Sequence, residues 1–450
     1  MSYVKSALDR IKAKNAGELE FLQAAGEVLA TIAPLADKDP KYEKYSILER
    51  MAEPDRIIIF RVTWLDDQNR VQVNRGFRVQ YNEALGPYKG GLRFHPSVNL
   101  SVIKFLGFEQ IFKNSLTGLA IGGGKGGSDF DPKGRSEGEI MRFCQAFMTE
   151  LFKYLGPTID VPAGDIGVGG REIGYMVGQY KRITSEHNGV LTGKGLDWGG
   201  SLGRTQATGY GAVYLAQNMM QGAGQDLEGK TCLVSGSGNV SIYAIEKLYH
   251  IGAKPVTCSD SGGFIYDKNG INLEVLKQVK EVERARLTRY KKLVPKAEYT
   301  PVEKYPKGRN AVWHMPCQAA FPCATQNELN GHDARELLKN GCICLSEGAN
   351  MPCDDEAVSR FLKAGIYYAP GKAANAGGVA TSQLEMSQNA SMQSWTFEEV
   401  DHKLQAIMKG IYTAASQTAR EFGEPANLVM GANIAGFRKV AQAMIDLGAI

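Results

Sequence analysis

Four polar residues in the first third of the chain have the types and spacing of a pocket for an anionic substrate. Lys89 lies in Tyr88-Lys-Gly-Gly-Leu-Arg, which we interpret as a turn where glycines let a ligand approach the backbone. Gln110 and Lys113 are three residues apart, so a helix would place them on one face. Lys125 stands inside the run Gly122-Gly-Gly-Lys-Gly-Gly. Three lysines together suit a substrate with two carboxylates.

Lys125 is the candidate for proton transfer among these residues. A lysine packed among glycines near other cations would have a depressed pKa and could exchange protons near neutrality. Asp165, in Val161-Pro-Ala-Gly-Asp-Ile-Gly-Val-Gly, lies in a constrained turn that also offers free backbone amides. Taken singly, each residue has a simpler explanation, because most lysines are surface charges and most aspartates in such turns bond their own backbone.

A second group of residues has the pattern of a dinucleotide site. Lys230–Ser235 predicts a buried strand, a helical run follows to His250, and Pro255–Asp260 predicts a second strand. Glycines at the first turn let the backbone approach a pyrophosphate, and the helix N-terminus favours its charge. The turn consists of Gly236, Ser237, Gly238, Asn239 and Val240. Asp260 ends the second strand, where the adenosine ribose lies in such folds.

The choice between NAD and NADP stays open at this point. An acid such as Asp260 ordinarily accepts the ribose 2′-hydroxyl and favours NAD. Ser259 and Ser261 flank it and can donate to a phosphate, and basic residues follow on what we interpret as a helix: Lys277, Lys280, Arg284, Arg286 and Arg289. These basic residues would favour NADP, or they form a solvated helix face.

The surrounding elements predict two α/β domains and a helical C-terminus. Alternating residues predict paired strands over 56–64 and 71–81, and helical spacing predicts helices over 6–36, from 97 onward and over 136–155. Residues 1–203 should form a mixed α/β substrate and oligomerisation domain, ending at a glycine-rich hinge over 193–211. Residues 204–378 should form a Rossmann-like doubly wound sheet, with a cleft between the domains. Helices over 379–450 should return and pack across that cleft.

Composition narrows the class of protein. A net charge of +4, from 52 basic and 48 acidic residues spread along the chain, argues against a nucleic-acid binder. The N-terminus lacks a signal-peptide pattern, and we see no stretch approaching the roughly 20 apolar residues of a membrane span, so the cytoplasm is expected. Eight cysteines without zinc spacing are expected to be reduced thiols, and no metal is expected.

Five separated motifs together resemble the hexameric glutamate dehydrogenases of the Glu/Leu/Phe/Val dehydrogenase family, over nearly the whole chain. The motifs are Pro87-Tyr-Lys-Gly-Gly-Leu-Arg-Phe, Leu106-Gly-Phe-Glu-Gln-Ile-Phe-Lys-Asn, Gly122-Gly-Gly-Lys-Gly-Gly-Ser-Asp-Phe-Asp-Pro, Pro162-Ala-Gly-Asp-Ile-Gly-Val-Gly and Ala373-Ala-Asn-Ala-Gly-Gly-Val-Ala-Thr-Ser. Leu119-Ala-Ile and Ser241 depart from the family pattern, which puts local packing in question but leaves the chemistry intact.

The resemblance implies a role for each candidate residue. Lys89 and Ser382 would hold the substrate side-chain carboxylate, and Gln110, Lys113 and the Gly164 backbone the α-carboxylate. Lys125 would activate water, and Asp165 would exchange protons with the substrate nitrogen. The cofactor would be fixed by the turn residues together with Thr208, Asn350 and Asn375. The implied reaction is reversible deamination of L-glutamate to 2-oxoglutarate and ammonia with NADP, run as reductive amination by a cytoplasmic homohexamer.

Two other functions are compatible with parts of the sequence. A leucine or phenylalanine dehydrogenase would use the same lysine and aspartate, but an apolar substrate would leave Lys89 charged and unpaired, so leucine would be expected there. A catalytically silent protein could keep the fold. Lys125 and Asp165 argue against it, because both reactive groups are present.

Overall fold

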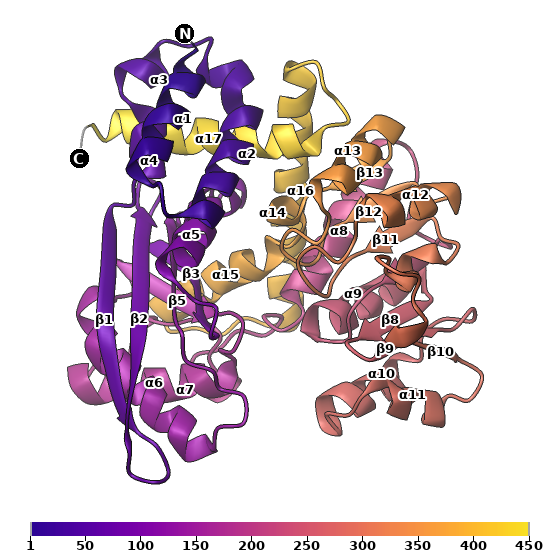
Figure 1. Ribbon diagram of the computed structural model, residues 1–450, viewed down its shortest axis with the longest axis horizontal. Coiled ribbons are helices and arrows are strands. Elements are labelled where there is room, and N and C mark those ends of the chain that lie inside the picture. Colours follow the sequence, from indigo (N-terminus) through magenta and orange to yellow (C-terminus); the bar gives the residue numbers. More distant parts are fainter. Residues whose placement is uncertain (1, 449–450) are drawn as a thin grey trace. The chain divides into compact units, whose positions relative to one another are not determined.

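The computed structural model describes residues 2–448, and the chain divides into two compact units (Figure 1). The first unit comprises the described part of Met1–Arg204, Val379–Val400 and Asn433–Ile450, and the second comprises Thr205–Gly378 and Asp401–Ala432. The expected C-terminal segment 379–450 is therefore not a third unit, because its residues are shared between the other two. Its packing across a cleft stays a prediction.

A five-stranded mixed sheet forms the centre of the first unit. Its order is β1-β2-β4-β3-β5, with antiparallel pairing of β1, β2 and β4 and parallel pairing of β4, β3 and β5. The strands are β1 (Arg56–Leu65), β2 (Val71–Asn82), β3 (Tyr88–Phe94), β4 (Gly123–Ser128) and β5 (Asp160–Gly164). The two predicted strands are confirmed. The predicted turn at Lys89 is wrong, because that segment is β3 and pairs on both sides with its neighbours.

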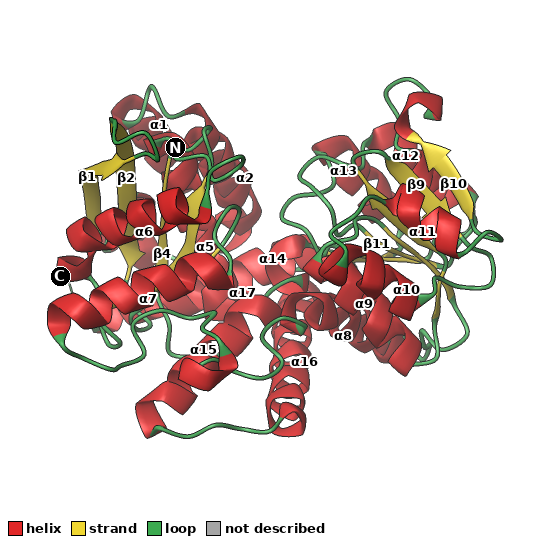
Figure 2. Ribbon diagram, turned by 90° about the horizontal axis from the view of Figure 1, so that it is seen from below, coloured by secondary structure: helices red, strands yellow, loops and turns green. Residues whose placement is uncertain are grey.

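Helices cover both faces of this sheet (Figure 2). α5 (Leu100–Leu116) packs on the face that carries Lys125, since a Cβ at Gly107 would lie 3.6 Å from the Lys125 Cβ. α6 (Glu137–Leu151) and α7 (Gly170–Thr184) cover the opposite face. α6 starts where Ser136 and Glu139 cap each other's backbone amides. The N-terminal helices are α1 (Tyr3–Lys14), α2 (Leu19–Ala36), α3 (Lys41–Lys44) and α4 (Ile47–Ala52).

The N-terminal region differs from its prediction in two ways. The single helix expected over 6–36 is two helices, α1 and α2, because Asn15 caps the end of α1. Contrary to expectation, α2 is also long and apolar enough to cross a membrane by length and composition alone, a test that core helices pass as well. Its Phe21 ring packs at 5.8 Å against Phe108 of α5, as in a core helix.

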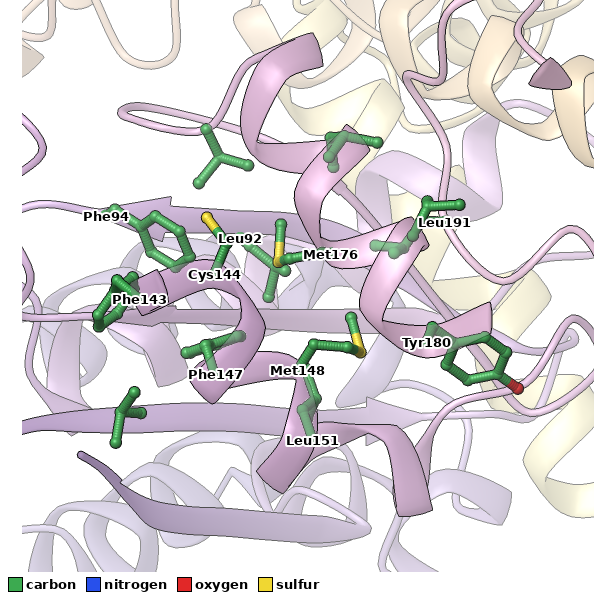
Figure 3. Close-up of a cluster of buried hydrophobic side chains, with 14 of the residues drawn as sticks. Leu92, Phe94, Phe143, Cys144, Phe147, Met148, Leu151, Met176, Tyr180 and Leu191 are labelled. Carbon is green, nitrogen blue, oxygen red and sulfur yellow. The ribbon is translucent and has the colours of Figure 1, made fainter. Parts of the chain in front are cut away.

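An aromatic cluster fills the space between the sheet and helices α6 and α7 (Figure 3). Phe143 of α6 stacks on Phe130 with ring centroids 3.8 Å apart, and its edge meets Phe94 of β3 at 5.1 Å. Trp64 of β1 closes the cluster 6.1 Å from Phe143. These rings pack on one face of β3, and strand alternation places Lys89 on the opposite face.

The second unit contains a parallel sheet of order β13-β12-β11-β6-β7 and an antiparallel sheet of order β10-β9-β8. The strands are β6 (Thr231–Val234), β7 (Lys254–Pro255), β8 (Thr257–Asp260), β9 (Gly263–Tyr266), β10 (Glu298–Pro301), β11 (Ala319–Phe321), β12 (Cys344–Ser346) and β13 (Tyr367–Ala369). The helices are α8 (Ala207–Gly222), α9 (Asn239–His250), α10 (Leu273–Lys277), α11 (Leu287–Leu293), α12 (Gly331–Lys339), α13 (Asp355–Ala364) and α14 (Gly371–Ala374). The predicted doubly wound domain is confirmed.

Three long helices include residues of both units. They are α15 (Gly377–Ser391), α16 (Phe397–Glu421) and α17 (Leu428–Asp446).

Two predictions within the second unit are corrected. The strand expected over Pro255–Asp260 is interrupted at Val256, and its second half joins the antiparallel sheet. The single basic helix is also broken, because Arg284 adopts a positive φ of 52° between α10 and α11.

Replacing Phe143 with alanine tests the aromatic cluster. Loss of a fully buried phenylalanine should lower the free energy of unfolding by about 3–5 kcal/mol. Urea denaturation followed by tryptophan fluorescence measures it. Met141→Ala is the matched control, because Met141 lies on the same helix with 37% of its surface exposed. Equal denaturation midpoints for the two variants would contradict the assigned role of the cluster.

Candidate active site

Lys125 and Asp165 meet on one face of the first unit's sheet. Lys125 lies on β4, and Asp165 directly follows β5. The Lys125 Nζ is 3.3 Å from Asp165 Oδ2. Strand β3 runs between them, and a Cβ at Gly91 would lie 2.8 Å from the Asp165 Cβ and 3.3 Å from the Lys125 Nζ. Only glycine at this position leaves room for the pair.

Arg93 belongs to this group, although no sequence pattern indicated it. Its Nε donates to Asp165 Oδ2 at 2.7 Å. Burial alone would raise the pKa of Asp165, but Lys125 and Arg93 lower it below its usual value, so the group is a carboxylate. Burial lowers the pKa of Lys125, Arg93 lowers it further, and Asp165 opposes both effects. Strand alternation from Gly91 identifies Arg93, once the segment is known to be a strand.

Lys89 is fully buried on β3. Its Nζ donates to the Thr192 hydroxyl at 2.9 Å, a contact that sequence reasoning did not find because the two residues are far apart in the chain. Burial lowers the pKa of Lys89 far below its ordinary value, and Arg204 lowers it further. A buried amine whose partner is a neutral hydroxyl can accept an incoming carboxylate.

Gln110 and Lys113 lie on α5, as predicted. Burial lowers the pKa of Lys113 to about 8, and the neighbouring Lys125 contributes to the shift. The Gln110 amide donates to Asn114 Oδ1 at 2.6 Å. Asn114 was not predicted, and its own amide donates to the Lys89 carbonyl at 3.0 Å and to the Gly122 carbonyl at 2.5 Å. It therefore ties α5 to the strand of Lys89.

Gly164 and Ser382 also belong to the first unit. Gly164 ends β5, and a Cβ there would lie 2.5 Å from the Val168 carbonyl oxygen, so the chain turns tightly after the strand. Ser382 is buried on α15. One turn further along the same helix, Glu385 is fully buried and pairs with Lys194 at 3.0 Å. This carboxylate was not predicted, and it raises the pKa of Lys89 against the effect of burial.

The predicted dinucleotide turn lies in the second unit, between β6 and α9. Gly236 has a φ of 83°, and its amide donates to the Ser259 hydroxyl at 2.7 Å. Ser237 is buried, whereas Gly238 and Asn239, at the start of α9, are exposed and Val240 is partly buried. The turn therefore presents free amides at a helix N-terminus, which fits a pyrophosphate.

Asp260 accepts hydrogen bonds from two backbone amides, and its contact with a cofactor ribose stays a prediction. Its Oδ1 accepts from the Gly262 amide and its Oδ2 from the Leu287 amide, each at 2.9 Å. It thus holds the loop that precedes α11, and Arg286 in that loop donates to the Ser261 hydroxyl. Two of the basic residues have acidic partners, because Lys277 pairs with Glu246 and Arg289 with Glu283.

Asn375 supplies an independent sign of a cofactor. Its amide nitrogen donates to Asn350 Oδ1 at 2.8 Å and to the Ala349 carbonyl at 3.1 Å. Its own Oδ1 is buried and, within the described part of the chain, has no hydrogen-bond partner. An orphaned acceptor of this kind fits a carboxamide donor. Thr208 lies partly buried near the start of α8 in the same unit.

Glu328 was missed because it follows β11 in an irregular loop. Its Oε1 accepts from the Ser235 hydroxyl and the Ala324 amide, each at 2.9 Å. Burial raises the pKa of Glu328 to about 7. The residue therefore joins the ends of two adjacent parallel strands, β6 and β11, where open α/β sheets bind ligands. Over residues 2–448, no group of three or more His, Cys, Asp or Glu is placed to hold a metal ion.

Family models match most of the chain. The model for Glutamate/Leucine/Phenylalanine/Valine dehydrogenase covers residues 199–448, and the model for the dimerisation domain of these enzymes covers residues 54–182. The chain belongs to this dehydrogenase family. The predicted resemblance and the two-domain architecture are therefore confirmed.

Individual members of the Glu/Leu/Phe/Val dehydrogenase family are similar to this chain over their full length. The NADP-specific glutamate dehydrogenase of Helicobacter pylori is 65% identical over 446 residues, which cover 99% of this chain and 100% of the relative. The NAD-specific glutamate dehydrogenase of Bacteroides fragilis is 53% identical over 447 residues, with 99% and 100% coverage. The crystal structure of Plasmodium falciparum glutamate dehydrogenase matches with a TM-score of 0.96 and 53% identity, covering 99% of this chain and 95% of that one.

The pH dependence of substrate binding tests Lys113. With a pKa of about 8, this lysine is cationic below that pH and neutral above it. The KM of a dicarboxylate substrate should therefore be lowest below this pKa and rise by up to about tenfold per pH unit above it. Lys113→Gln should raise KM at low pH and flatten the profile, as measured by initial rates. Lys439→Gln is the control and should keep the wild-type profile. The Nζ of Lys439 donates to the Ser115 carbonyl at 3.4 Å. An unchanged profile in Lys113→Gln would exclude the assigned contact.

Proposed function

We propose that this member of the family is an NADP-dependent glutamate dehydrogenase. It converts L-glutamate reversibly to 2-oxoglutarate and ammonia. The observation that carries the proposal is the group of three shielded lysines with lowered pKa values, Lys89, Lys113 and Lys125, of which the last contacts Asp165. The name of the Helicobacter pylori relative supports the same substrate and cofactor.

The substrate carboxylates are proposed to bind at opposite ends of this group. Lys89, together with Ser382, receives the side-chain carboxylate. Lys113, Gln110 and the Gly164 backbone receive the α-carboxylate. A bound anion restores the charge that burial disfavours on Lys89, so binding and protonation of the lysine support each other. Fixing both carboxylates orients the α-carbon, which supplies much of the rate through proximity.

Lys125 and Asp165 are proposed to move the protons. NADP held by the Gly236–Val240 turn and Asn375 would supply the hydride acceptor for the substrate α-carbon, and the substrate would then be an iminium. With its lowered pKa, Lys125 takes a proton from the water that adds to this iminium. Asp165, held as a carboxylate by Lys125 and Arg93, accepts and returns the protons of the substrate nitrogen as ammonia leaves.

The cofactor is proposed to bind through residues of the second unit. The pyrophosphate meets the amides of the turn from Gly236 to Val240, and Asn375 and Asn350, with Thr208, hold the nicotinamide end. Because both Asp260 oxygens accept backbone amides, the carboxylate is less available to a ribose hydroxyl than in the NAD pattern. Ser261 and Arg286 remain to receive a 2′-phosphate, which favours NADP.

A homohexamer in the cytoplasm, acting in nitrogen assimilation, is also proposed. One face of the β1–β2 hairpin exposes apolar side chains, with Ile59 at 51%, Val71 at 64% and Val73 at 62% exposure. The hairpin lies in the region matched by the dimerisation-domain model. An apolar sheet face of this kind supports contact with a second copy of the chain.

The activity and its substrate are tested with wild type and Lys89→Leu. Wild type should oxidise NADPH with 2-oxoglutarate and ammonium, seen as loss of nicotinamide absorbance. Lys89→Leu should lose activity toward 2-oxoglutarate by several orders of magnitude, while activity with the apolar analogue 2-oxovalerate is kept or raised, because only the dicarboxylate needs the buried amine. An inactive wild type would favour the catalytically silent alternative. Equal losses with both substrates would exclude the role of Lys89.

Cofactor choice is tested by Arg286→Ala. Loss of a charge-assisted contact should lower kcat/KM with NADPH about tenfold or more and leave NADH nearly unaffected. Arg289→Ala is the matched control, because Arg289 is paired with Glu283 and should not change the ratio. Asp260→Ala should weaken both cofactors by loosening the loop before α11. An NADPH to NADH ratio that Arg286→Ala leaves unchanged would place the 2′-phosphate elsewhere.

A further inference from the structure

A buried ion pair lies on the face of the first unit's sheet opposite Lys125. Arg78 on β2 and Asp160 at the start of β5 have no exposed surface. The Arg78 Nε donates to Asp160 Oδ2 at 2.9 Å, and its Nη2 donates to Oδ1. Gln80 adds a third bond to the same carboxylate at 3.0 Å. The carboxylate is therefore fully engaged, as a buried charge requires.

The pair spans most of the sheet. β2 and β5 are not neighbours, because β4 and β3 run between them. The Arg78 side chain must therefore lie flat across both strands, and its Nη1 donates to the Gly90 carbonyl on β3 at 3.1 Å. One guanidinium thus contacts β3 and β5 from β2 and crosses β4.

The glycines beside Lys125 make room for this crossing. A Cβ at Gly124 would lie 3.3 Å from the Arg78 Nη2, and a Cβ at Gly126 would lie 3.1 Å from its Cδ. Alternation along β4 puts Gly124 and Gly126 on the Arg78 face and Lys125 on the other. Gly124 and Gly126 therefore make room for Arg78 on one face of β4, and Lys125 lies on the other face.

We propose that Arg78 and Asp160 are positioning residues for the reaction, which fix the strands of Lys89 and Lys125 relative to the strand that leads into Asp165. The proposal rests on the proposed function. β3 carries Lys89, β4 carries Lys125, and β5 ends one residue before Asp165. The pair therefore sets the spacing between Lys125 and Asp165 without touching the substrate. The charge of Arg78 also lowers the pKa values of both lysines.

Three variants separate geometry from charge. Arg78→Met combined with Asp160→Asn removes the pair without leaving a buried charge. Arg78→Lys keeps the charge but cannot bind Asp160 and Gly90 together. Phe143→Ala is the control for lost stability, because it weakens the core on the same face without touching the pair. Thermal unfolding and the assembly state of each variant are measured first, and rates are compared below the lowest unfolding temperature.

The double variant should lose kcat by on the order of 10²-fold, as expected for a displacement of about 1 Å, while the KM for NADPH stays within about twofold. The acidic limb of the plot of its kcat against pH should move to higher pH. The positive charge of Arg78 is gone, so the pKa of Lys125 rises. Arg78→Lys should lose kcat but keep that limb, and Phe143→Ala should keep both. If the folded double variant keeps the wild-type kcat and the wild-type position of the acidic limb, the pair has a purely structural role.

A readout that does not need activity separates this inference from the proposed function. The pKa of Lys125 can be followed by the pH dependence of its reaction with an amine-reactive aldehyde and borohydride, quantified by mass spectrometry. It should rise in the double variant and stay near the wild-type value in Arg78→Lys. An inactive wild type in which Lys125 still responds would overturn the proposed function alone. An unchanged Lys125 pKa in an active, folded double variant would overturn the positioning role.

Discussion

The close approach of strands β3 and β4 is the constraint on which the candidate site depends. At Gly90, a Cβ would lie 1.6 Å from the Gly124 carbonyl oxygen, a distance that no side chain can adopt. The glycines of β3 and β4 leave room beside the backbone on both faces of the sheet, so long side chains can lie flat against it. Lys125 reaches over Gly91 to Asp165 on one face, and Arg78 crosses β4 on the other. Without the glycines, neither charged group could reach its partner.

The same constraint explains which parts of the site could be predicted from sequence. Alternating apolar and polar residues predicted β1 and β2, and helical spacing predicted α5 with Gln110 and Lys113. The glycine turn predicted the start of α9. Glycine signals turns in a single sequence, because in isolation it disfavours strands. The glycines beside Lys89 therefore predict a turn, and a turn gives no reason to single out Arg93, whose role follows from strand alternation. Only pairing with strands distant in the chain makes β3 a strand. Asn114, Thr192 and Glu385 are likewise defined by contacts between distant segments, which periodicity does not report.

Burial of positive charge gives the first unit its chemical character. Lys89 and Lys113 lie where burial lowers their pKa values, whereas Asp165 is held as a carboxylate by two cations. Placing cations in such surroundings costs stability, and the aromatic cluster on the opposite face of the sheet offsets part of that cost. This buried positive charge has a function, because an anionic substrate neutralises it. The site is therefore more stable with its ligand than without it, which is common where stability is sacrificed for function.

In the second unit, backbone amides must be held where a phosphate can approach them. Ser241, which departs from the family pattern, helps to hold them. A Cβ at Gly236 would lie 2.3 Å from the Ser241 hydroxyl, so the serine occupies the space that the glycine leaves open. That hydroxyl donates to the Cys323 carbonyl at 3.4 Å, and the Cys323 amide in turn donates to Ser235 at 2.9 Å. Ser241 therefore adds a hydrogen bond between the turn after β6 and the loop after β11, where an alanine could contribute only packing. The Ser235 hydroxyl also donates to Glu328, so the two loops that border the expected cofactor site are joined by a continuous set of hydrogen bonds that involve side chains. The turn is held from behind, and its amides stay free toward solvent, which is the arrangement that anion binding requires.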